Sequence, residues 1–282
     1  MNFITDNKIP LGQWMEAGVD WLTINAAGLF DAISFFLETV ILFLVDVFKW
    51  MPPALPILIT AALAWYLHRK ISLVVFVVAA LLVILNLGYW QEMLETFVLV
   101  FAATSISVLI GVPIGIMSAH RPWLYTLMRP ILDLMQTVPT FVYLIPTLVL
   151  FGLGIVPGLI STIIFAIAAP IRLTYLGITK VPEDLIEAGK AFGASRMKLL
   201  LKVELPAAMP SIMAGITQCI MLSLSLSMVV IAALVGADGL GKPVVRALNT
   251  VNISQGFEAG LAIVLVAIIL DRLCKTPAQK EL

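Results

Sequence analysis

Residues 180–206 read KVPEDLIEAGKAFGASRMKLLLKVELP, and this polar stretch separates two long and predominantly apolar runs, Val156–Leu176 and Ala207–Val235. A bilayer's hydrocarbon core is about 30 Å thick, and a helix needs about 20 apolar residues to cross it. Each apolar run is long enough to cross the bilayer. The polar stretch between them is too hydrophilic to lie in the hydrocarbon core. The pattern therefore predicts an all-α integral membrane protein with residues 180–206 outside the bilayer.

The composition of the whole chain agrees with this class. Of its 282 residues 61% are hydrophobic and 12% are charged, whereas soluble domains average about 45–50% and about 25%. The net charge is zero and no run of lysine or arginine occurs, which leaves nucleic-acid binding without electrostatic support. Cys219 and Cys274 show no metal-site or disulfide spacing, and we expect both to be packing residues.

Five further apolar runs bring the expected number of transmembrane helices to about seven. They are Ala54–Leu67, Ile71–Gly88, Thr96–Ser118, Val138–Leu153 and Ala259–Leu270. The first two are joined only by His68, Arg69 and Lys70, which predicts a tight helical hairpin. The basic residues of residues 68–70, 121–129, 180–202 and 272–280 fall on alternate sides of the spans, so that all four segments share one side. Short cytoplasmic loops are enriched in lysine and arginine, so we expect this side and the C-terminus to be cytoplasmic.

The N-terminal part of the chain contains a helix that differs from the other spans. Residues 30–51 are apolar by hydropathy, but Asp31, Ser34, Glu38, Asp46 and Lys49 form one stripe at helical spacing. A polar stripe of this kind favours an amphipathic helix lying in the membrane interface, although a crossing stays open as the alternative. Tryptophans gather near both of its ends, at positions 14, 21 and 50, and indole rings concentrate at interfaces.

The polar stretch 180–206 carries the signals of two short helices. Pro182, Glu183 and Asp184 favour the start of the first helix, and Gly193 suits the left-handed conformation that closes it. Ser195 can cap the second helix. Pro206 is expected to stop this second helix from continuing unbroken into the next span.

The same stretch resembles a known signature. Glu187-Ala188-Gly189, Gly193, Val203 and Leu205-Pro206 match the motif Glu-Ala-Ala, three residues, Gly, nine residues, Ile, one residue, Leu-Pro, with two mild replacements. This motif is typical of the membrane subunits of bacterial ABC importers. The resemblance implies that the loop fits a groove on a separate ATPase subunit, and that Glu187, Ala188, Gly189, Gly193, Leu205 and Pro206 couple the ATPase to the spans. The alternative interpretation is an ordinary polar loop in which the glycine only forms a turn.

The resemblance extends from about Thr96 to Arg272 and is closest to the permeases for glycine betaine, proline and related quaternary amines. It is carried by the stretches 130–144, 156–158, 170–174 and 267–272. It implies a type I ABC importer permease fold for this part of the chain. Together with the hydropathy of the remaining residues, we expect four parts. These are an N-terminal interfacial segment (1–53), a transmembrane hairpin (54–95), a five-helix transmembrane domain with the coupling segment 180–206 (96–273) and a short cytoplasmic tail (274–282). Residues 221–229 depart from the family by an apparent extra Leu-Ser pair.

The resemblance also implies the partners of an osmoprotectant importer. They are an ABC ATPase that holds ATP and magnesium, an extracytoplasmic solute-binding protein and a second permease copy, most economically an identical one. No phosphate-binding loop of the type Gly-x-x-x-x-Gly-Lys-Ser/Thr occurs in this chain, so we expect a transporter subunit without cofactor, metal or catalytic residues. We expect this subunit to lie in the cell membrane, where the lipid bilayer is a further partner.

Polar residues inside the apolar runs are candidates for the transport pathway, because polar groups are costly in lipid. Gln136, Thr137, Pro139, Thr140 and Tyr143 gather at the entry of one span. Hydrogen bonding between helices is the competing interpretation. Asp133 and Arg172 lie near the expected cytoplasmic ends of their spans. We expect them to pair structurally rather than to act in catalysis.

Two other functional classes compete with the importer. An ion-coupled secondary transporter needs ionisable groups near the membrane midplane, and the longest spans are almost free of them. An intramembrane enzyme needs a constellation such as Gly-x-Ser-x-Gly or His-Glu-x-x-His, and neither motif is present.

Overall fold

The computed structural model describes residues 10–275, and this part of the chain is almost entirely helical. The helices are α2 (Leu11–Asn25), α3 (Ala27–Trp50), α4 (Ala54–His68), α5 (Ile71–Asn86), α6 (Trp90–His120), α7 (Pro122–Thr137), α8 (Thr140–Phe151), α9 (Ile155–Ala166), α10 (Ala168–Thr179), α11 (Glu183–Ala191), α12 (Arg196–Leu199), the π-helical turn Leu200–Glu204, α13 (Leu205–Ser223), α14 (Leu226–Leu234), α15 (Gly241–Thr250) and α16 (Ile253–Cys274). The predicted all-α class is confirmed. Most of the tail expected at 274–282 lies outside the described residues.

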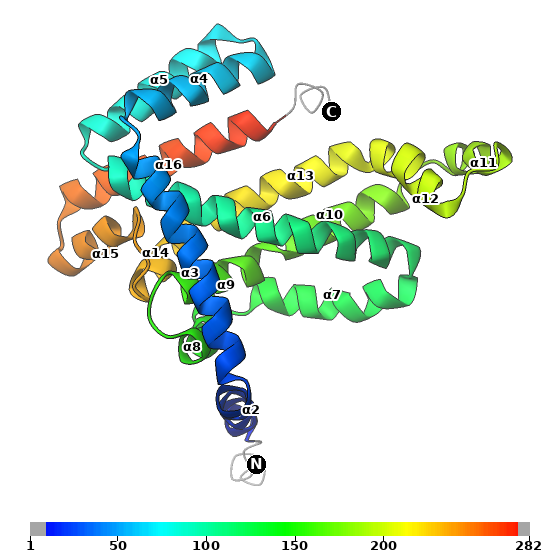
Figure 1. Cartoon of the computed structure of the whole chain (residues 1–282), viewed down its shortest axis with the longest axis horizontal. Coiled ribbons are helices and arrows are strands. Elements are labelled where there is room, and N and C mark those ends of the chain that lie inside the picture. Colours follow the sequence, from blue (N-terminus) through cyan, green and yellow to red (C-terminus); the bar gives the residue numbers. More distant parts are fainter. Residues whose placement is uncertain (1–9, 276–282) are drawn as a thin grey trace, which may run out of the picture.

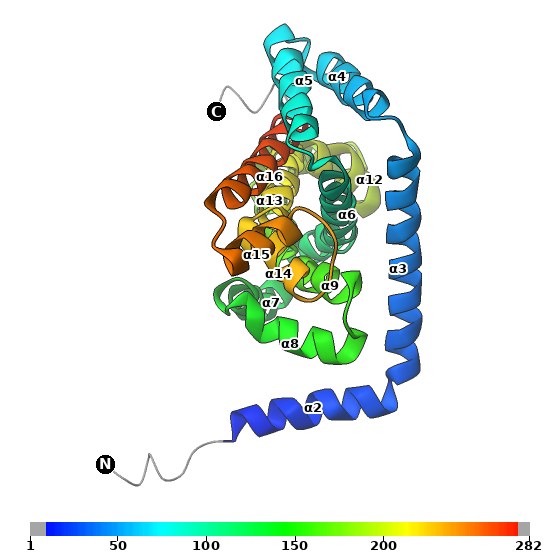
Figure 2. The same cartoon turned by 90° about the vertical axis from the view of Figure 1, so that its left-hand side faces the viewer.

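The long helices form a bundle with two different ends (Figures 1 and 2). Helices α6, α10 and α13 run side by side, and α11 projects beyond them at one end, here termed the α11 end. Helix α15 lies at the opposite end, termed the α15 end. The turns after α4, α6 and α10 and the end of α16 all point toward the α11 end, as expected from the alternation of the basic segments.

Small residues let the central helices approach closely. A Cβ atom added to Gly115 of α6 would lie 2.7 Å from Cβ of Thr174 on α10 and 2.8 Å from the carbonyl oxygen of Ile171. A Cβ atom added to Gly177 of α10 would lie 2.8 Å from Cβ of Ser211 on α13. Contacts of this kind are typical of helix pairs in membranes, where van der Waals packing drives association. Helix α10 is therefore held between α6 and α13.

Five segments of the described chain are long and apolar enough to cross a membrane, and the bent pair α7–α8 makes up to six. They are Ala27–Trp50, Trp90–His120, Ile155–Thr179, Arg196–Ser223 and Ile253–Cys274. Helices α4 and α5 are apolar but shorter and form the predicted hairpin. The number of spans is close to the seven predicted, and the chain is a multi-pass membrane protein.

Two predicted spans are not single straight helices. In Val138–Leu153, helix α8 lies at 95° to α7 across a break at Val138 and Pro139. Val138 is extended because it precedes a proline. Residues 207–235 are also broken, since α13 ends at Ser223 and α14 begins at Leu226. This break lies within residues 221–229, the stretch with the apparent extra Leu-Ser pair.

Helix α3 begins at Ala27, three residues earlier than predicted. It lies across the bundle, and Figure 2 shows it along its full length. Its C-terminal end contacts the start of α6, and its N-terminal end contacts the end of α8. Near its C-terminus, Nζ of Lys49 lies 2.6 Å from Oε1 of Glu95 in the second turn of α6. Near its N-terminus, the ring of Phe30 packs edge-on against Phe151 at the end of α8, with 5.2 Å between the ring centroids. Its length and hydropathy would allow a crossing, and the interfacial position stays a prediction.

Candidate functional site

The segment at the α11 end has the two-helix form that its sequence predicts. Glu183 and Asp184 occupy the first turn of α11, where carboxylates interact favourably with the positive helix end. Gly193 closes the helix at φ +72°. Its N–H donates to the carbonyl of Lys190 (2.9 Å), and the N–H of Ala194 donates to the carbonyl of Gly189 (3.1 Å). These paired bonds form a Schellman motif, which requires a left-handed residue at position 193.

The second helix differs from the prediction at its C-terminal end. Ser195 caps α12 as expected, accepting a bond of 3.4 Å from the N–H of Lys198. Pro206, however, does not interrupt the helix, because the backbone stays helical from Arg196 to Ser223. The π-helical turn Leu200–Glu204 precedes the proline. A proline ring clashes with the carbonyl four residues before it, and the wider π turn moves that carbonyl away. The second short helix is thus continuous with α13.

Helix α11 has an outer face and an inner face. Glu187, Ala188 and the side chain of Phe192, which is 92% exposed, face outward. Gly189 faces α12, and a Cβ atom there would lie 2.6 Å from Cδ1 of Leu199. Among the other predicted coupling residues, Gly193 and Pro206 are exposed, while Leu205 is half-buried in the cluster around Ile178, Ala208 and Ile212. The predicted residues therefore divide into an exposed set on the outside of the segment and a set that packs inward.

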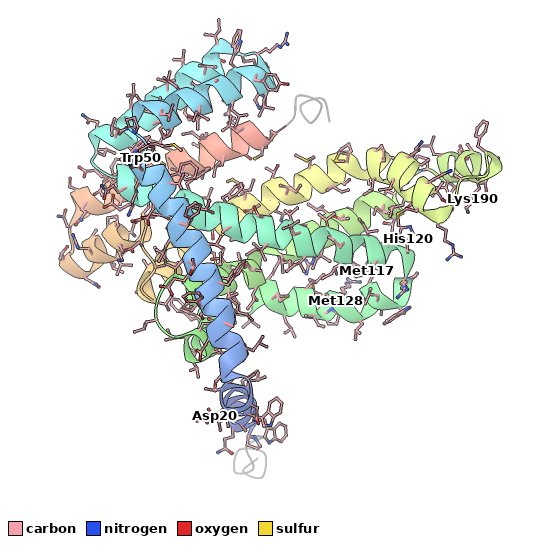
Figure 3. All side chains as sticks on the ribbon, in the orientation of Figure 1. Asp20, Trp50, Met117, His120, Met128 and Lys190 are labelled. Atoms are coloured by element: carbon pink, nitrogen blue, oxygen red, sulfur yellow. The ribbon has the colours of Figure 1, made fainter. Side chains whose placement is uncertain are left out.

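A contact between His120 and a buried carboxylate lies at the base of this segment, and no local sequence signal predicts it. Glu204 is 6% exposed, and its Oε2 lies 2.8 Å from Nε2 of His120, the last residue of α6. Nδ1 of the same ring lies 2.9 Å from the carbonyl oxygen of Ile116. Figure 3 shows His120 at the same end of the bundle as Lys190 of α11. His120 therefore links α6 to the π-helical turn.

The five pathway candidates lie together at the bend between α7 and α8. Gln136 and Thr137 end α7, Pro139 and Thr140 begin α8, and Tyr143 follows one turn later. Thr137 donates to the carbonyl of Asp133 within its own helix (2.8 Å). The hydroxyl of Tyr143 is buried and has no hydrogen-bond partner in the described part of the chain. Tyr143 therefore carries an unused polar group inside the apolar region, whereas Thr137 is satisfied locally.

Two side-chain contacts fix α7 against α10. Nη2 of Arg172 lies 2.6 Å from Oδ1 of Asp133, as the preferred structural pairing predicts. The rings of Tyr125 and Tyr175 are stacked with an interplanar angle of 3°. These contacts hold the helix that leads to the bend.

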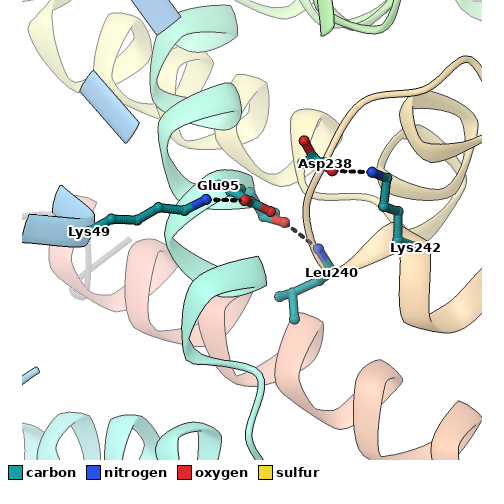
Figure 4. A network of polar contacts seen from close by, with 6 residues as sticks. Lys49, Glu95, Asp238, Leu240 and Lys242 are labelled. Carbon is teal, nitrogen blue, oxygen red and sulfur yellow. Dashed lines mark hydrogen bonds and ion pairs between the residues drawn. The ribbon is translucent and has the colours of Figure 1, made fainter. Parts of the chain in front are cut away.

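A polar network ties the α15 end together (Figure 4). The Lys49–Glu95 pair joins α3 to α6. The hydroxyl of Thr96 accepts a bond of 2.8 Å from the N–H of Leu240, and Lys242 in the first turn of α15 pairs with Asp238 in the loop before it. This end of the bundle is thus rigidly joined to the loop that leads into α15. Within residues 10–275, no group of three or more His, Cys, Asp or Glu side chains is placed to hold a metal ion.

A bundle of membrane-crossing helices with an exposed amphipathic helix at one end has the architecture of a membrane transport subunit. The comparisons with known proteins define it further. Residues 111–274 match the family described as the binding-protein-dependent transport system inner membrane component. The chain belongs to this family, and it is a transporter subunit rather than an enzyme.

Several curated relatives resemble it over most of this chain's length. It is 46% identical to the glycine betaine transport system permease protein OpuAB of Bacillus subtilis, covering 97% of this chain and 96% of that protein. It is 44% identical to the glycine betaine/carnitine transport permease protein GbuB of Listeria monocytogenes, covering 96% of each. The permease protein ProW of Escherichia coli, for glycine betaine and proline betaine, is 42% identical over 94% of this chain and 74% of that protein.

Solved structures support the fold. The inward-facing methionine ABC transporter MetNI contains a chain that matches with a TM-score of 0.56 and 24% identity. The match covers 64% of this chain and 90% of that one. It supports the predicted type I importer permease fold.

Proposed function

We propose that this chain is the permease subunit of an ATP-driven importer of compatible solutes, namely glycine betaine and related quaternary amines or proline. It forms the translocation pathway and couples it to a separate ATPase through α11. The observation that carries the proposal is the geometry of α11, which projects beyond the bundle with its outer face uncovered. Leu185 and Phe192 lie two helical turns apart along α11 and are both exposed outside the spans, and exposed apolar patches mark protein–protein interaction sites.

The inner face of α11 provides the mechanical link to the spans. Gly189 packs on Leu199, and α12 continues through the π-helical turn into α13. A displacement of α11 by the ATPase is therefore passed to α13 as a rigid movement instead of being absorbed in a flexible loop. The His120–Glu204 pair extends the same movement to α6.

The remaining assembly follows from the two ends of the bundle. The α11 end and the C-terminus face the cytoplasm because the basic segments lie there, and the ATPase with its ATP and magnesium binds at this end. The solute-binding protein docks at the α15 end. A second, identical permease chain completes the pathway, with the bend at Gln136, Thr137, Pro139, Thr140 and Tyr143 facing the passage. The proposed solutes rest on the transport named for the similar permeases.

The test is uptake of labelled glycine betaine into vesicles that contain this chain, its ATPase and its binding protein, with ATP present or withheld. Choline, carnitine and proline are measured in parallel. We expect ATP-dependent uptake that is lost in Gly193→Val and largely kept in Gly193→Asn. Position 193 has φ +72° with open space around it, and asparagine tolerates this left-handed conformation whereas a β-branched residue does not.

The outcomes separate the mechanism from the solute. Uptake driven by an ion gradient without ATP would replace the importer by a secondary transporter. ATP-driven uptake of another solute would keep the mechanism and correct the cargo. Equal uptake by Gly193→Val and the unchanged chain, at equal amounts of inserted protein, would remove α11 from the coupling pathway.

A further inference from the structure

A groove of about 740 Å³ lies between the α4–α5 turn and the end of α16. It lies away from α11 and from the α7–α8 bend. Its lining residues come from three helices and from the turn between α4 and α5: His68, Lys70, Ser72, Leu73, Phe76, Asp271, Arg272 and Lys275. Neither the coupling segment nor the proposed pathway uses any of them.

The polar wall of the groove is positively charged. Lys70, Arg272 and Lys275 oppose one carboxylate, Asp271, so three positive charges less one negative leave +2 with His68 neutral. Asp271 is already paired with Lys275 at 2.7 Å. Within residues 10–275 no ion pair involves Lys70 or Arg272. The groove therefore presents two cations that the protein itself does not neutralise.

The helix ends around the groove do not cancel this charge. Helices α4 and α16 end there and α5 begins there. At roughly half an elementary charge per helix end, two negative ends and one positive end sum to about −0.5. This is much smaller than the +2 of the side chains, so the groove attracts an anion.

The other wall is apolar and lies deeper along the hairpin. Leu73 and Phe76 are three and six residues beyond Lys70 on α5, which places them about 5 and 9 Å further along the helix axis. The groove thus has basic residues at its mouth and apolar residues below them. A phospholipid has a matching order, with its phosphate at the interface and its acyl chains in the hydrocarbon core. A free phosphate ion would use only the mouth.

His68 connects the two sides of the groove. Its Nε2 lies 3.3 Å from the carbonyl oxygen of Leu273 on α16, which holds the turn of the hairpin against the end of that helix. Hydrophobic packing between α5 and α16, through Val77, Ala80 and Leu81 with Val266 and Ile269, continues below it. The two walls therefore keep a fixed separation at the mouth.

We propose that this groove binds the phosphate headgroup of an anionic phospholipid between Lys70 and Arg272, with an acyl chain along Leu73 and Phe76. Basic pockets between transmembrane helices are suited to such headgroups. The site is independent of the transported solute and of the ATPase.

Native mass spectrometry of the purified full-length chain tests this site. Binding of phosphatidylglycerol is compared with that of phosphatidylcholine carrying the same acyl chains. We expect a preference for phosphatidylglycerol that falls about thirtyfold in Lys70→Gln/Arg272→Gln, since each basic residue near a membrane surface contributes roughly 1 kcal/mol. The variant Lys70→Arg should keep the preference. Arg121→Gln/Lys180→Gln removes the same charge at the same end but outside the groove, and should also keep it.

Two outcomes would overturn the proposal. The first is an equal loss of preference in the Arg121→Gln/Lys180→Gln control, which would mean a diffuse charge effect. The second is displacement of phosphatidylglycerol by inorganic phosphate or by water-soluble glycerophosphoglycerol at similar concentrations, which would mean an anion site without an acyl chain. Thermal unfolding of each variant verifies that the fold is retained.

Discussion

Nε2 of His120, the last residue of α6, lies 2.8 Å from Oε2 of Glu204, whose side chain is 8% exposed. Nδ1 of the same ring lies 2.9 Å from the carbonyl oxygen of Ile116. His120 thus joins the last turn of α6 to the turn that carries residues 180–206 into α13.

Removing the histidine leaves the buried carboxylate without its partner. We expect His120→Ala to lower the free energy of unfolding by about 1–3 kcal/mol, the cost of an unsatisfied buried polar group. Thermal unfolding of the purified chain in detergent measures this. The double variant His120→Ala/Glu204→Gln should recover part of the loss, because its buried group is neutral. A double variant no more stable than His120→Ala would show that the carboxylate charge is not the cause.

The inner face of α11 predicts a size-dependent effect at position 189. Gly189→Ala should be nearly neutral, because the atom it approaches is the flexible Cδ1 end of Leu199 and the family motif has alanine there. Gly189→Leu should separate α11 from α12 and lower solute-stimulated ATPase activity of the assembled complex at least about fivefold, since overpacking costs about 1–3 kcal/mol. Equal activity of both variants would contradict rigid packing at this contact.

The contact between α6 and α10 predicts a different response in two glycines of the spans. Gly115→Ala introduces a Cβ atom 2.7 Å from Cβ of Thr174 and 2.8 Å from a backbone carbonyl, neither of which can move without shifting a helix. We expect a loss of about 1–3 kcal/mol in the free energy of unfolding. Gly260→Ala in α16 is the matched control, because nothing lies within 4 Å of its Cβ position. Similar unfolding temperatures for the two variants would contradict the packing.

The position of α3 predicts labelling from one side of the membrane. Asp31 and Lys49 lie near opposite ends of this helix, and both are exposed. If α3 lies in the outer interface, an impermeant maleimide added to intact cells should label Asp31→Cys and Lys49→Cys alike. A crossing helix would allow labelling at only one of the two. Val77→Cys, buried in the α4–α5 hairpin, is the unlabelled control.

Local chemistry made the coupling segment predictable. Pro182, the acidic first turn, Gly193 and Ser195 act within one or two helical turns, so their effects can be read from neighbouring residues. The exception is Pro206, for which the local rule predicted a helix break. The π-helical turn that accommodates this proline also brings Glu204 next to His120, a contact that residues within one turn do not reveal.

Amino-acid sequence by itself determined the all-helical membrane class, the hairpin of Ala54–Leu67 and Ile71–Gly88, the common end of the basic segments and the two short helices of the coupling segment. These depend on hydropathy and on nearest neighbours along the chain. Only the tertiary structure decided the bend before α8, the pairing of His120 with Glu204 and the basic groove beside α16. Each of these depends on which helices become neighbours, and that is fixed by the packing of small residues such as Gly115 and Gly177 between helices distant in sequence.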